Sequence, residues 1–538
     1  GNTTGNDNNT ISNNNIGPIS GSSLSTKGIY ANGSTATAAV GNNNNLITNN
    51  NFYDYFGAAV ASAGIYIGGG NSAWSITNNK FYQTGTRTWT TGAQHSAIWI
   101  SNTTSTTGAQ GFTITGNTIG YSSSSGTGTY AMTGSTGKFI GIQFSGLTDG
   151  ALNTISNNSI SNFSLTAVSS SGTTTSAPFI GFYFTGGLIT SSSNNIGSQS
   201  ATGNITITST TTSASDFYGF YCSATNNWTC NKNTIGGINI QTNATSNASL
   251  FMGIRAVQGS STNLLTVDSN TIGGFVAHSV RNTTGSSSCQ VKGIYNTVGA
   301  PNITNNVIRN FTANNGTGTG TGASINGIYN SSSSTSTPYT ISGNTIDSLT
   351  NSHASASCQI IGILHAASVT NSAGSGIVNN TVFYLNTPST GSITLYGIQV
   401  SSATNVNVGG NKIYTIFGTG ATGTHTLSGI HISGGTTVNA YGNKIYDLYS
   451  SSAGAGVNGV NVSSLTTLNM YNNVIGDLRA TAATGLDAVR GLNASATCTY
   501  NVYYNTIVLA ASSSSASTFG TSCITFSSTA TTLDLRNN

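Results

Sequence analysis

Acid–base chemistry in this chain would have to come from very few carboxylates. The 538 residues contain 10 acidic side chains, and all of them are Asp. Asp447 and Asp477 each lie four residues after an Asn in successive copies of a repeated phrase, and Asp54 has the same place in a distant copy. One interpretation is a carboxylate pair or a cation site. We favour the simpler interpretation, in which these are turn residues with Lys444 or Arg479 nearby.

Basic residues give one further grouping and exclude one class of partner. Arg255 is predicted to project from an outer strand face, with Asp216 and Asp268 in the neighbouring repeats. The net charge is +4, and the 14 Lys and Arg residues form no basic run. Because nucleic-acid binding requires clustered positive charge, we expect no nucleic-acid partner.

The histidines do not complete a catalytic site. His365 falls at a position that is predicted to face the core, which favours a buried structural histidine over a general base. His425 and His431 share one repeat, but the pattern brings no carboxylate to either of them. We therefore assign no catalytic residue, no metal ligand and no cofactor, and we expect that the protein is not an enzyme.

The six cysteines show no metal-binding spacing. Cys222 and Cys230 are both predicted to face inward in one repeat, where they either bridge a corner or fill space. Cys289 and Cys358 each lie four residues before a Gly, but two repeats apart. Two strand spacings amount to about 9.6 Å, which is too far for a disulfide. We expect buried and mostly free thiols.

The dominant feature of the sequence is an Asn-x-[Ile/Val/Phe] phrase, and its copies are 29 to 41 residues apart. A further copy begins at Asn537 or Asn538, where the sequence stops. Such regular self-similarity indicates a repeat architecture. The other copies begin at Asn14, Asn50, Asn79, Asn117, Asn158, Asn194, Asn233, Asn270, Asn306, Asn344, Asn380, Asn411, Asn443, Asn473 and Asn505.

A second phrase, Gly-[Ile/Phe/Val/Leu]-x, lies between these Asn residues. The last four segments from this Gly to the next Asn are each 14 residues long. One arc of the repeat is therefore nearly constant, and the other arc carries the insertions. Ala97 replaces the Gly in one repeat, and the phrase begins elsewhere at Gly28, Gly64, Gly141, Gly181, Gly219, Gly253, Gly293, Gly327, Gly362, Gly397, Gly429, Gly459 and Gly491.

Alternating apolar residues predict three short strands of about three to five residues in each repeat. The first follows the Gly, with Ile65 and Ile67 facing inward and Tyr66 outward. The second ends at the Asn, and the third follows it. The Asn is expected to hold a left-handed corner, because Asn tolerates positive φ. Its amide is expected to form an asparagine ladder with those of adjacent coils. The clearest predicted members are Asn117, Asn158, Asn233, Asn270, Asn306, Asn344, Asn411, Asn443, Asn473 and Asn505.

A single repeat cannot be stable by itself. Burying four or five apolar side chains contributes roughly 1.5–3 kcal/mol each, whereas ordering the backbone costs on the order of 1–2 kcal/mol for every residue. Neighbouring repeats must therefore share a core and pair their strands. With strands about 4.8 Å apart, the stack would form a rod roughly 70 Å long. We predict one continuous domain over residues 1–538, an all-β solenoid of about fifteen coils.

The stretches GIHISGGTTVNAYGNKIYDL and GIYNTVGAPNITNNVIRNF resemble the right-handed parallel β-helix repeat. This repeat is shared by the pectate-lyase superfamily and by large secreted bacterial surface proteins and adhesins. The resemblance covers nearly the whole chain and implies the fold. It does not select an activity, because the same coil serves lyases, glycoside hydrolases, epimerases, tailspikes and passive stalks.

An aromatic row offers a possible binding surface. The second residue after the Gly is predicted to face outward, and it is aromatic in most of the first nine repeats. Aromatic rings can stack against the apolar faces of sugars. The alternative is an aromatic ladder between neighbouring strands, which we favour. The row consists of Tyr30, Tyr66, Trp99, Tyr183, Tyr221, Tyr295 and Tyr329.

We expect an extracellular structural protein, either a filament subunit or an adhesin stalk. Only 4% of residues are charged, and Ser, Thr, Asn and Gly dominate the polar composition. The first Asn phrase is present by Asn14, and the last residues, TLDLRNN, stop at a further phrase Asn. Neither end shows an amphipathic capping helix. Open coils favour pairing with further strands, so we expect either a piece of a longer surface protein or end-to-end self-association. The alternative is a carbohydrate-binding or polysaccharide-cleaving protein. No uninterrupted apolar stretch indicates a membrane span.

Overall fold

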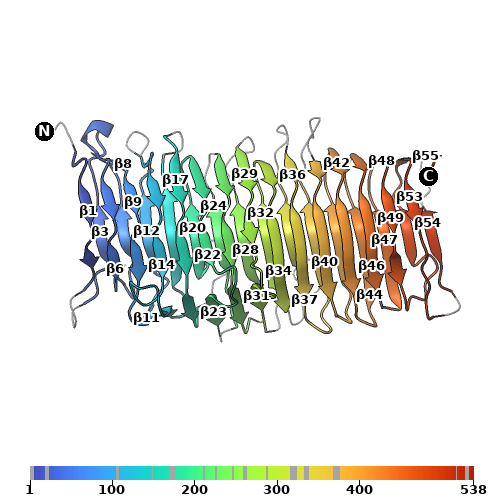
Figure 1. The fold of residues 1–538 in the computed structure, drawn as a ribbon, viewed down its shortest axis with the longest axis horizontal. Coiled ribbons are helices and arrows are strands. Elements are labelled where there is room, and N and C mark those ends of the chain that lie inside the picture. Colours follow the sequence, from blue (N-terminus) through green and yellow to red (C-terminus); the bar gives the residue numbers. More distant parts are fainter. Residues whose placement is uncertain are drawn as a thin grey trace. The chain divides into compact units, whose positions relative to one another are not determined.

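The computed structural model describes residues 5–18, 23–103, 108–147, 150–168, 176–209, 212–223, 227–244, 248–257, 263–285, 289–314, 324–332, 339–367, 376–515, 518–527 and 532–538. It comprises two compact units, Gly1–Arg281 and Asn282–Asn538, and each is described by itself. The expectation of one continuous domain stays a prediction. Both units are all-β parallel solenoids with three strands per coil, as the sequence predicts (Figure 1).

Each coil contributes strands to three parallel sheets. We name them the Gly sheet, whose strands contain or align with the Gly phrase, the pre-Asn sheet, which precedes the phrase Asn, and the post-Asn sheet, which follows it. Within the described residues, the helical element is η1 (Ala38–Val40). A short pair of strands, β4 (Asn42–Asn43) and β8 (Asn71–Ser72), accompanies the first coils, and β31 (Val280–Thr283) contains the division between the units.

The strands of the first unit follow chain order within each sheet. The Gly sheet comprises β3 (Lys27–Ala31), β7 (Ser62–Ile67), β12 (Gln94–Ser101), β16 (Lys138–Ser145), β20 (Phe179–Phe184), β24 (Phe217–Cys222) and β28 (Ser249–Ala256). The pre-Asn sheet comprises β1 (Thr10–Ser12), β5 (Leu46–Thr48), β9 (Ser75–Thr77), β13 (Thr113–Thr115), β17 (Asn153–Ser156), β21 (Ile189–Ser192), β25 (Trp228–Asn231) and β29 (Leu264–Asp268). The post-Asn sheet comprises β2 (Asn15–Ile16), β6 (Asn51–Tyr53), β10 (Lys80–Tyr82), β14 (Thr118–Gly120), β18 (Ser159–Ser161), β22 (Asn195–Gly197), β26 (Thr234–Gly236) and β30 (Thr271–Ile272). It continues in β11 (Arg87–Thr88), β15 (Tyr130–Thr133), β19 (Phe163–Thr166), β23 (Ile205–Ser209) and β27 (Ile238–Thr242).

The second unit repeats this plan. The Gly sheet comprises β32 (Cys289–Asn296), β35 (Ser324–Asn330), β38 (Cys358–His365), β41 (Ile393–Val400), β44 (Thr424–Ile432), β47 (Gly454–Val462), β51 (Val489–Ala494) and β54 (Thr521–Phe526). The pre-Asn sheet comprises β33 (Ala300–Thr304), β36 (Thr340–Ser342), β39 (Gly376–Val378), β42 (Asn405–Gly409), β45 (Thr437–Tyr441), β48 (Thr467–Tyr471), β52 (Thr499–Tyr503) and β55 (Thr532–Arg536). The post-Asn sheet comprises β34 (Val307–Asn314), β37 (Thr345–Asn351), β40 (Thr381–Thr387), β43 (Lys412–Gly418), β46 (Lys444–Ser450), β49 (Val474–Gly476), β50 (Leu478–Ala480) and β53 (Thr506–Val508).

The Gly-sheet strands are longer than predicted. β44 has nine residues and begins five residues before Gly429, so the expectation of a strand that only follows the Gly is wrong. The strand extends because Leu427 on its N-terminal side also packs in the core, where it is fully buried. The inward positions after the Gly are correct, since Ile65, Ile67 and Ile430 are fully buried as well.

The two phrases fit together in space. A Cβ atom added to Gly327 would lie 2.6 Å from Cγ2 of Ile346, which is the apolar residue of the Asn phrase in the same coil. It would also lie 2.6 Å from the carbonyl oxygen of Gly362 in the next coil. The absent side chain of the Gly therefore makes room for the Ile and for close approach of the next strand, which explains why both phrases recur together.

We expect Gly327→Ala to destabilise the second unit by about 2 kcal/mol, because the core must shift to admit the methyl group. The matched control is Gly456→Ala in β47, where the nearest heavy atom to an added Cβ is 4.0 Å away. Urea denaturation should show a lower midpoint for the first variant and little change for the second. Equal midpoints would contradict the steric account.

Ladder hydrogen bonds connect successive coils at the corner between the pre-Asn and post-Asn sheets. Asn158 donates from its backbone N–H (3.0 Å) and from Nδ2 (2.9 Å) to Oδ1 of Asn194. Its Nδ2 also donates to the carbonyl of Ile114 at 3.0 Å, and its Oδ1 accepts both donors of Asn117. The same bonds join Asn14 to Asn270 stepwise in the first unit and Asn306 to Asn538 in the second. The predicted asparagine ladder is confirmed.

The left-handed residue is not the ladder Asn, which corrects the prediction. The residue immediately before it has positive φ instead, as in Asn157 (φ 55°), Gly410 (φ 63°) and Asn472 (φ 55°). The ladder Asn must direct its amide into the coil stack, and Asn443 is fully buried there. The preceding residue makes the turn and is in most coils Gly, Asn or Ser, with Lys232 and Tyr504 as exceptions.

Candidate functional site

The predicted aromatic row lies on the Gly sheet, and its members are aligned in each unit. In the first unit, the register places Tyr30, Tyr66 and Trp99 in adjacent strands. Tyr183 and Tyr221 are likewise adjacent after Gln143 interrupts the row. In the second unit, Tyr295 is aligned with Tyr329, and Leu364 follows them.

Most rings of this row stack on one another. The ring centroids are 5.4 Å apart for Tyr30–Tyr66, 5.1 Å for Tyr183–Tyr221 and 4.8 Å for Tyr295–Tyr329, with interplanar angles of 10°, 14° and 25°. When the rings stack in parallel along the coil axis, each ring face is covered by the next ring and the ring edges point outward. A sugar would need those ring faces. The aromatic ladder that we favoured is therefore present, and carbohydrate binding by the row stays a prediction.

A second aromatic column was missed. Phe383, Tyr414 and Tyr446 each lie three residues after a ladder Asn, and they stack at 4.9 and 5.1 Å with nearly parallel rings. Lys412 Nζ lies 4.7 Å from the Tyr414 ring centroid and adds a cation–π contact. The recurring Asn-Lys-Ile-Tyr stretches, at Asn411 and Asn443, are the sequence signal that could have revealed this column.

The paired carboxylates are turn residues, as we favoured. Asp447 and Asp477 have φ of 58° and 48°, so each holds a left-handed corner four residues after its ladder Asn. Arg479 forms an ion pair with Asp447, and its Nε lies 3.0 Å from Oδ1 of Asp477. Thr415 Oγ1 donates to Asp447 Oδ2 at 2.7 Å. The Arg479 guanidinium thus lies between the two carboxylates and offsets one of their two negative charges.

The grouping around Arg255 does not form one cluster. Arg255 projects from β28 and lies 5.2 Å from the ring centroid of Tyr221, and its NH1 donates to Tyr218 at 3.3 Å. Asp216 accepts a hydrogen bond from the backbone N–H of Leu250 at 3.1 Å. Asp268 lies on β29 of the pre-Asn sheet, a different sheet from Arg255. Asp268 is thus separated from Arg255 by the corner between two sheets, whereas Asp216 and Arg255 both interact with Tyr218 of the Gly sheet.

His365 is a structural core histidine, as predicted. It is fully buried, its Nε2 lies 3.0 Å from the Tyr339 hydroxyl, and its ring stacks on that tyrosine. Burial lowers the pKa of His365 to about 3. His425 is also buried, with Nδ1 2.9 Å from the Ser450 hydroxyl. His431 packs on Tyr396 and is covered, and burial lowers its pKa to about 4.

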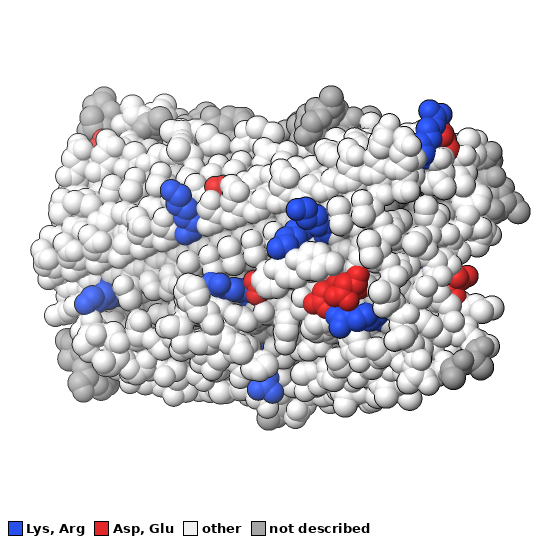
Figure 2. All heavy atoms as spheres, turned by 45° about the vertical axis from the view of Figure 1, so that its right-hand side comes forward, with Lys and Arg blue, Asp and Glu red and all other residues white. Residues whose placement is uncertain are grey.

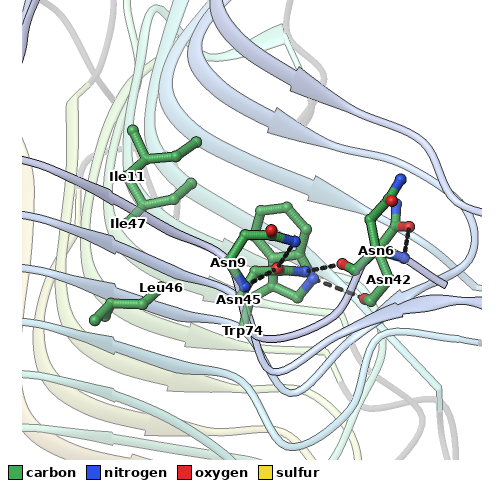
Figure 3. A pocket seen from close by; sticks show the side chains of 8 residues that line it. All are labelled: Asn6, Asn9, Ile11, Asn42, Asn45, Leu46, Ile47 and Trp74. Atoms are coloured by element: carbon green, nitrogen blue, oxygen red, sulfur yellow. Dashed lines mark hydrogen bonds between the residues drawn. The ribbon is translucent and has the colours of Figure 1, made fainter.

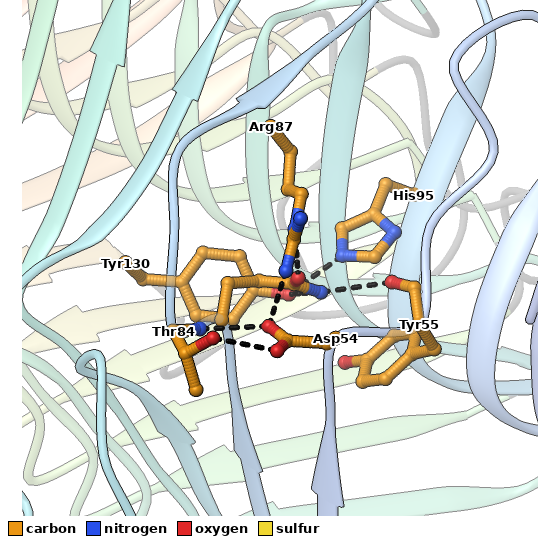
Figure 4. Close-up of polar contacts among 7 residues, drawn as sticks. Asp54, Tyr55, Thr84, Arg87, His95 and Tyr130 are labelled. Atoms are coloured by element: carbon orange, nitrogen blue, oxygen red, sulfur yellow. Dashed lines mark hydrogen bonds and ion pairs between the residues drawn. The ribbon is translucent and has the colours of Figure 1, made fainter. Parts of the chain in front are cut away.

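A buried polar network in the first unit was missed (Figure 4). His95 Nδ1 lies 2.8 Å from the Ser62 hydroxyl, and its Nε2 lies 2.6 Å from the Tyr130 hydroxyl. Gln83 Nε2 donates to the Tyr130 hydroxyl at 3.4 Å, and Arg87 Nε donates to Gln83 Oε1 at 2.6 Å. These residues come from β7, β11, β12, β15 and the segment between β10 and β11.

Asp54 completes the network at its outer end. Figure 4 shows its carboxylate between Thr84 and Arg87. Thr84 donates to it from the backbone N–H at 2.8 Å and from the hydroxyl at 2.6 Å, and Arg87 pairs with it. Asp54 also has positive φ (54°), so it shares the corner role of the other paired carboxylates.

Burial determines the protonation of this network. Ser62 and His95 resemble a nucleophile and base in their spacing, but they are 1% and 0% exposed. Burial, and to a smaller extent the charge of Arg87, lower the pKa of His95 to about 3. Burial also raises the pKa of Tyr130. All its members are therefore held neutral except the Asp54–Arg87 pair.

An apolar pocket of about 170 Å³ lies at the first coils (Figure 3). Ile11, Ile47 and Trp74 provide its apolar wall. Asn9 and Asn45 sit five residues before their ladder Asn, where Trp74 occupies the equivalent position of the next coil. The pocket forms because these two amides are smaller than that indole. Among the described residues that line it, none is titratable.

The cysteines and the surface charges add no reactive centre. All six cysteines are free, and all but Cys523 are buried. Among the described residues, there is no group of three or more His, Cys, Asp or Glu side chains that could hold a metal ion. Figure 2 shows scattered charged side chains on a largely uncharged face. Within the described part of the chain, no helix has the length and apolar character to cross a membrane.

Comparison with known proteins gave no match to a protein-family model, to a curated protein or to a solved structure. The β-solenoid class therefore rests on the chain's own strand pairing, and the function is argued from its surfaces.

Proposed function

We propose that the protein is an extracellular structural protein whose stacked coils serve as an adhesin stalk or a filament subunit. The observation that carries this proposal is the unbroken asparagine ladder within each unit, because one set of buried bonds repeats in every coil. The ionisable residues that the sequence singled out have structural partners. A coat of hydroxyl and amide groups with few charges also suits a passive surface element.

The bonding pattern of the ladder supports end-to-end association, because each ladder Asn donates to one neighbouring coil and accepts from the other. In the first unit, Asn14 donates to Asn50, and its own Oδ1 has no donor among the described residues. In the second unit, Asn538 Nδ2 donates to the Val502 carbonyl, and its backbone N–H has no described acceptor. A donor end and an acceptor end are complementary. A further coil, in another copy of the chain, would continue the same ladder.

Apolar side chains are exposed on β1 of the first unit and on β55 of the second. Leu535 is 47% exposed, although its column is buried in earlier coils, where Val502 and Met470 are fully buried. Ile11 in the first unit is 36% exposed in the column of the buried Ile47. Covering these side chains would contribute to association in proportion to the buried area.

Electron microscopy of the purified protein tests the proposal. We expect fibres that lengthen with concentration, and we expect Leu535→Asp to abolish them by placing a charge in the shared core. Leu486→Asp is the control, because Leu486 is 76% exposed outside the strands. Discrete particles at every concentration would overturn the end-to-end arrangement.

Polysaccharide binding is the second candidate function, and one cluster favours it. Trp99 meets Tyr66 edge to face, at 5.2 Å and 75°, so this pair is not a parallel stack. The Trp99 Nε1–H has no acceptor among the described residues, and Lys27 lies 5.6 Å from the Tyr66 ring centroid. That Nε1 is buried, so a sugar could stack only against the part of the indole ring that stays exposed. Polysaccharides that quench tryptophan fluorescence in the parent but not in Trp99→Phe would support this function, and equal responses would contradict it.

A further inference from the structure

We propose that the outer face of the pre-Asn sheet in the first unit binds ice. This proposal is independent of the proposed structural function. It rests on two columns of outward side chains that are aligned strand by strand from β1 to β29. Nearly all of them carry a hydroxyl group.

The first column lies four residues before each ladder Asn and consists of Thr10, Leu46, Ser75, Thr113, Thr154, Thr190, Thr229 and Thr266. The second lies two residues before it and consists of Ser12, Thr48, Thr77, Thr115, Ser156, Ser192, Asn231 and Asp268. Each of these side chains is at least partly exposed. The exceptions to the hydroxyl pattern are Leu46, Asn231 and Asp268.

The backbone beneath the array has two regular spacings at right angles. Neighbouring strands are about 4.8 Å apart, and alternate residues in a strand are about 6.6 Å apart. The strand spacing is close to the shorter repeat of the water oxygens on prism planes of hexagonal ice. A hydroxyl both donates and accepts hydrogen bonds, so each column can take the place of a row of lattice waters.

The array is held rigidly. Between the two columns, Ile76, Ile114 and Ile155 point inward and are fully buried, so the strands cannot rotate without opening the core. Thr side chains have restricted χ1 angles. Neighbouring hydroxyls also bond along the columns, as in Thr77 Oγ1 to Thr48 Oγ1 at 2.8 Å. Ordered waters would therefore meet fixed positions rather than a mobile surface.

Charge complementarity selects an uncharged ligand. Asp268 is the one charged side chain in the two columns, and it lies in the last strand of the array. The face has no aromatic ring, whereas polysaccharide sites use ring faces. Crystalline water fits a neutral, regular hydroxyl face better than a sugar polymer does.

The second unit shows that the fold does not require this array. The equivalent positions of β48 and β52 are Asn469, Tyr471, Asn501 and Tyr503 in the same register. Tyr441 and Tyr471 stack there at 5.3 Å, so a bulky ring is accommodated two residues before the ladder Asn. The hydroxyl face is thus a property of the first unit.

Ice-recrystallisation inhibition and thermal hysteresis of the whole chain test the proposal. We expect the parent protein to inhibit ice growth and Thr115→Tyr to lose most of that inhibition, because the ring rises from the centre of the face. Ser342→Tyr, at the equivalent position of β36 in the second unit, is the matched control and should keep full activity. Circular dichroism checks that both variants fold.

Three outcomes would overturn ice binding. The parent could leave ice growth unchanged relative to an equal mass of an unrelated protein. Thr115→Tyr could fold and remain as active as the parent. The parent could instead bind crystalline cellulose or chitin through this face, with binding lost in Thr115→Tyr and no effect on ice.

Discussion

Asn443→Ala is expected to destabilise the second unit by about 4 kcal/mol, which is a large loss for the removal of one buried amide. Asn443 Oδ1 accepts the backbone N–H and Nδ2 of Asn411, both at 3.0 Å. Its Nδ2 donates to the Val408 carbonyl at 2.8 Å and to Asn473 Oδ1 at 2.9 Å. Alanine leaves the buried N–H of Asn411 and the Val408 carbonyl without these partners. Each unsatisfied group costs about 1–3 kcal/mol.

Asn439 is the matched control in the same coil. Its Nδ2 donates to Asn407 Oδ1 at 2.9 Å, and its Oδ1 accepts Asn469 Nδ2 at 2.8 Å, so it also belongs to an axial Asn row. It is only half-buried, and water can replace its partners. We expect Asn439→Ala to cost less than about 1 kcal/mol.

Hydrogen exchange measured by mass spectrometry is the appropriate readout, because repeat proteins can open coil by coil. Asn443→Ala should speed exchange in the coils that contain β42 and β45, with a lower urea midpoint. Equal exchange in the two alanine variants would refute the role given to the ladder.

Acid is expected to destabilise the first unit between pH 6.5 and pH 4.5, by about 3 kcal/mol from His95 alone. Burial lowers the pKa of His95 to about 3 in the fold, against an ordinary value of about 6.5. Below pH 6.5 the unfolded chain binds a proton that the folded chain does not bind. The contribution of this neutral His is therefore complete above pH 6.5 and is lost as the pH falls toward 3. The measurement is the urea midpoint as a function of pH.

His95→Gln separates this effect from general acid sensitivity. The variant should be less stable at pH 7, because Ser62 and Tyr130 lose their imidazole partner. Its midpoint should nevertheless depend less on pH between 6.5 and 4.5, since Gln does not titrate. His278 is exposed, so His278→Gln should keep the slope of the parent. A slope in His95→Gln as steep as in the parent would contradict this explanation.

The sequence predicts the coil because the coil is a local pattern. Ile114 and Ile155 each lie three residues before a ladder Asn, and both are fully buried as that spacing requires. The backbone angles were harder to infer. Asn158 and Asn157 are the same residue type, and only the bonding in space shows that the first forms the ladder and the second makes the left-handed turn.

The buried network around His95 could not be predicted, because its members lie outside the recurring phrases. Ser62 and Gln83 come from one coil and Tyr130 from the next, which also contains His95, and no fixed spacing links them to His95. The insertions between the phrases vary in length, and the alignment of neighbouring coils brings these four side chains together. The sequence pattern also could not predict ring orientation. Strand alignment places Tyr183 beside Tyr221, but the side-chain rotamers determine that their ring faces meet.

The ladder has a genetic consequence. Each ladder Asn bonds to an identical residue in the next coil, as Asn411 does to Asn443 and Asn443 to Asn473. A DNA duplication that starts and ends at this codon would insert a whole coil and present the same amide on both sides. Unequal recombination within such a gene would therefore change chain length by complete coils while preserving the register of every other coil. Length variation between alleles in steps of one coil is the population signature to expect.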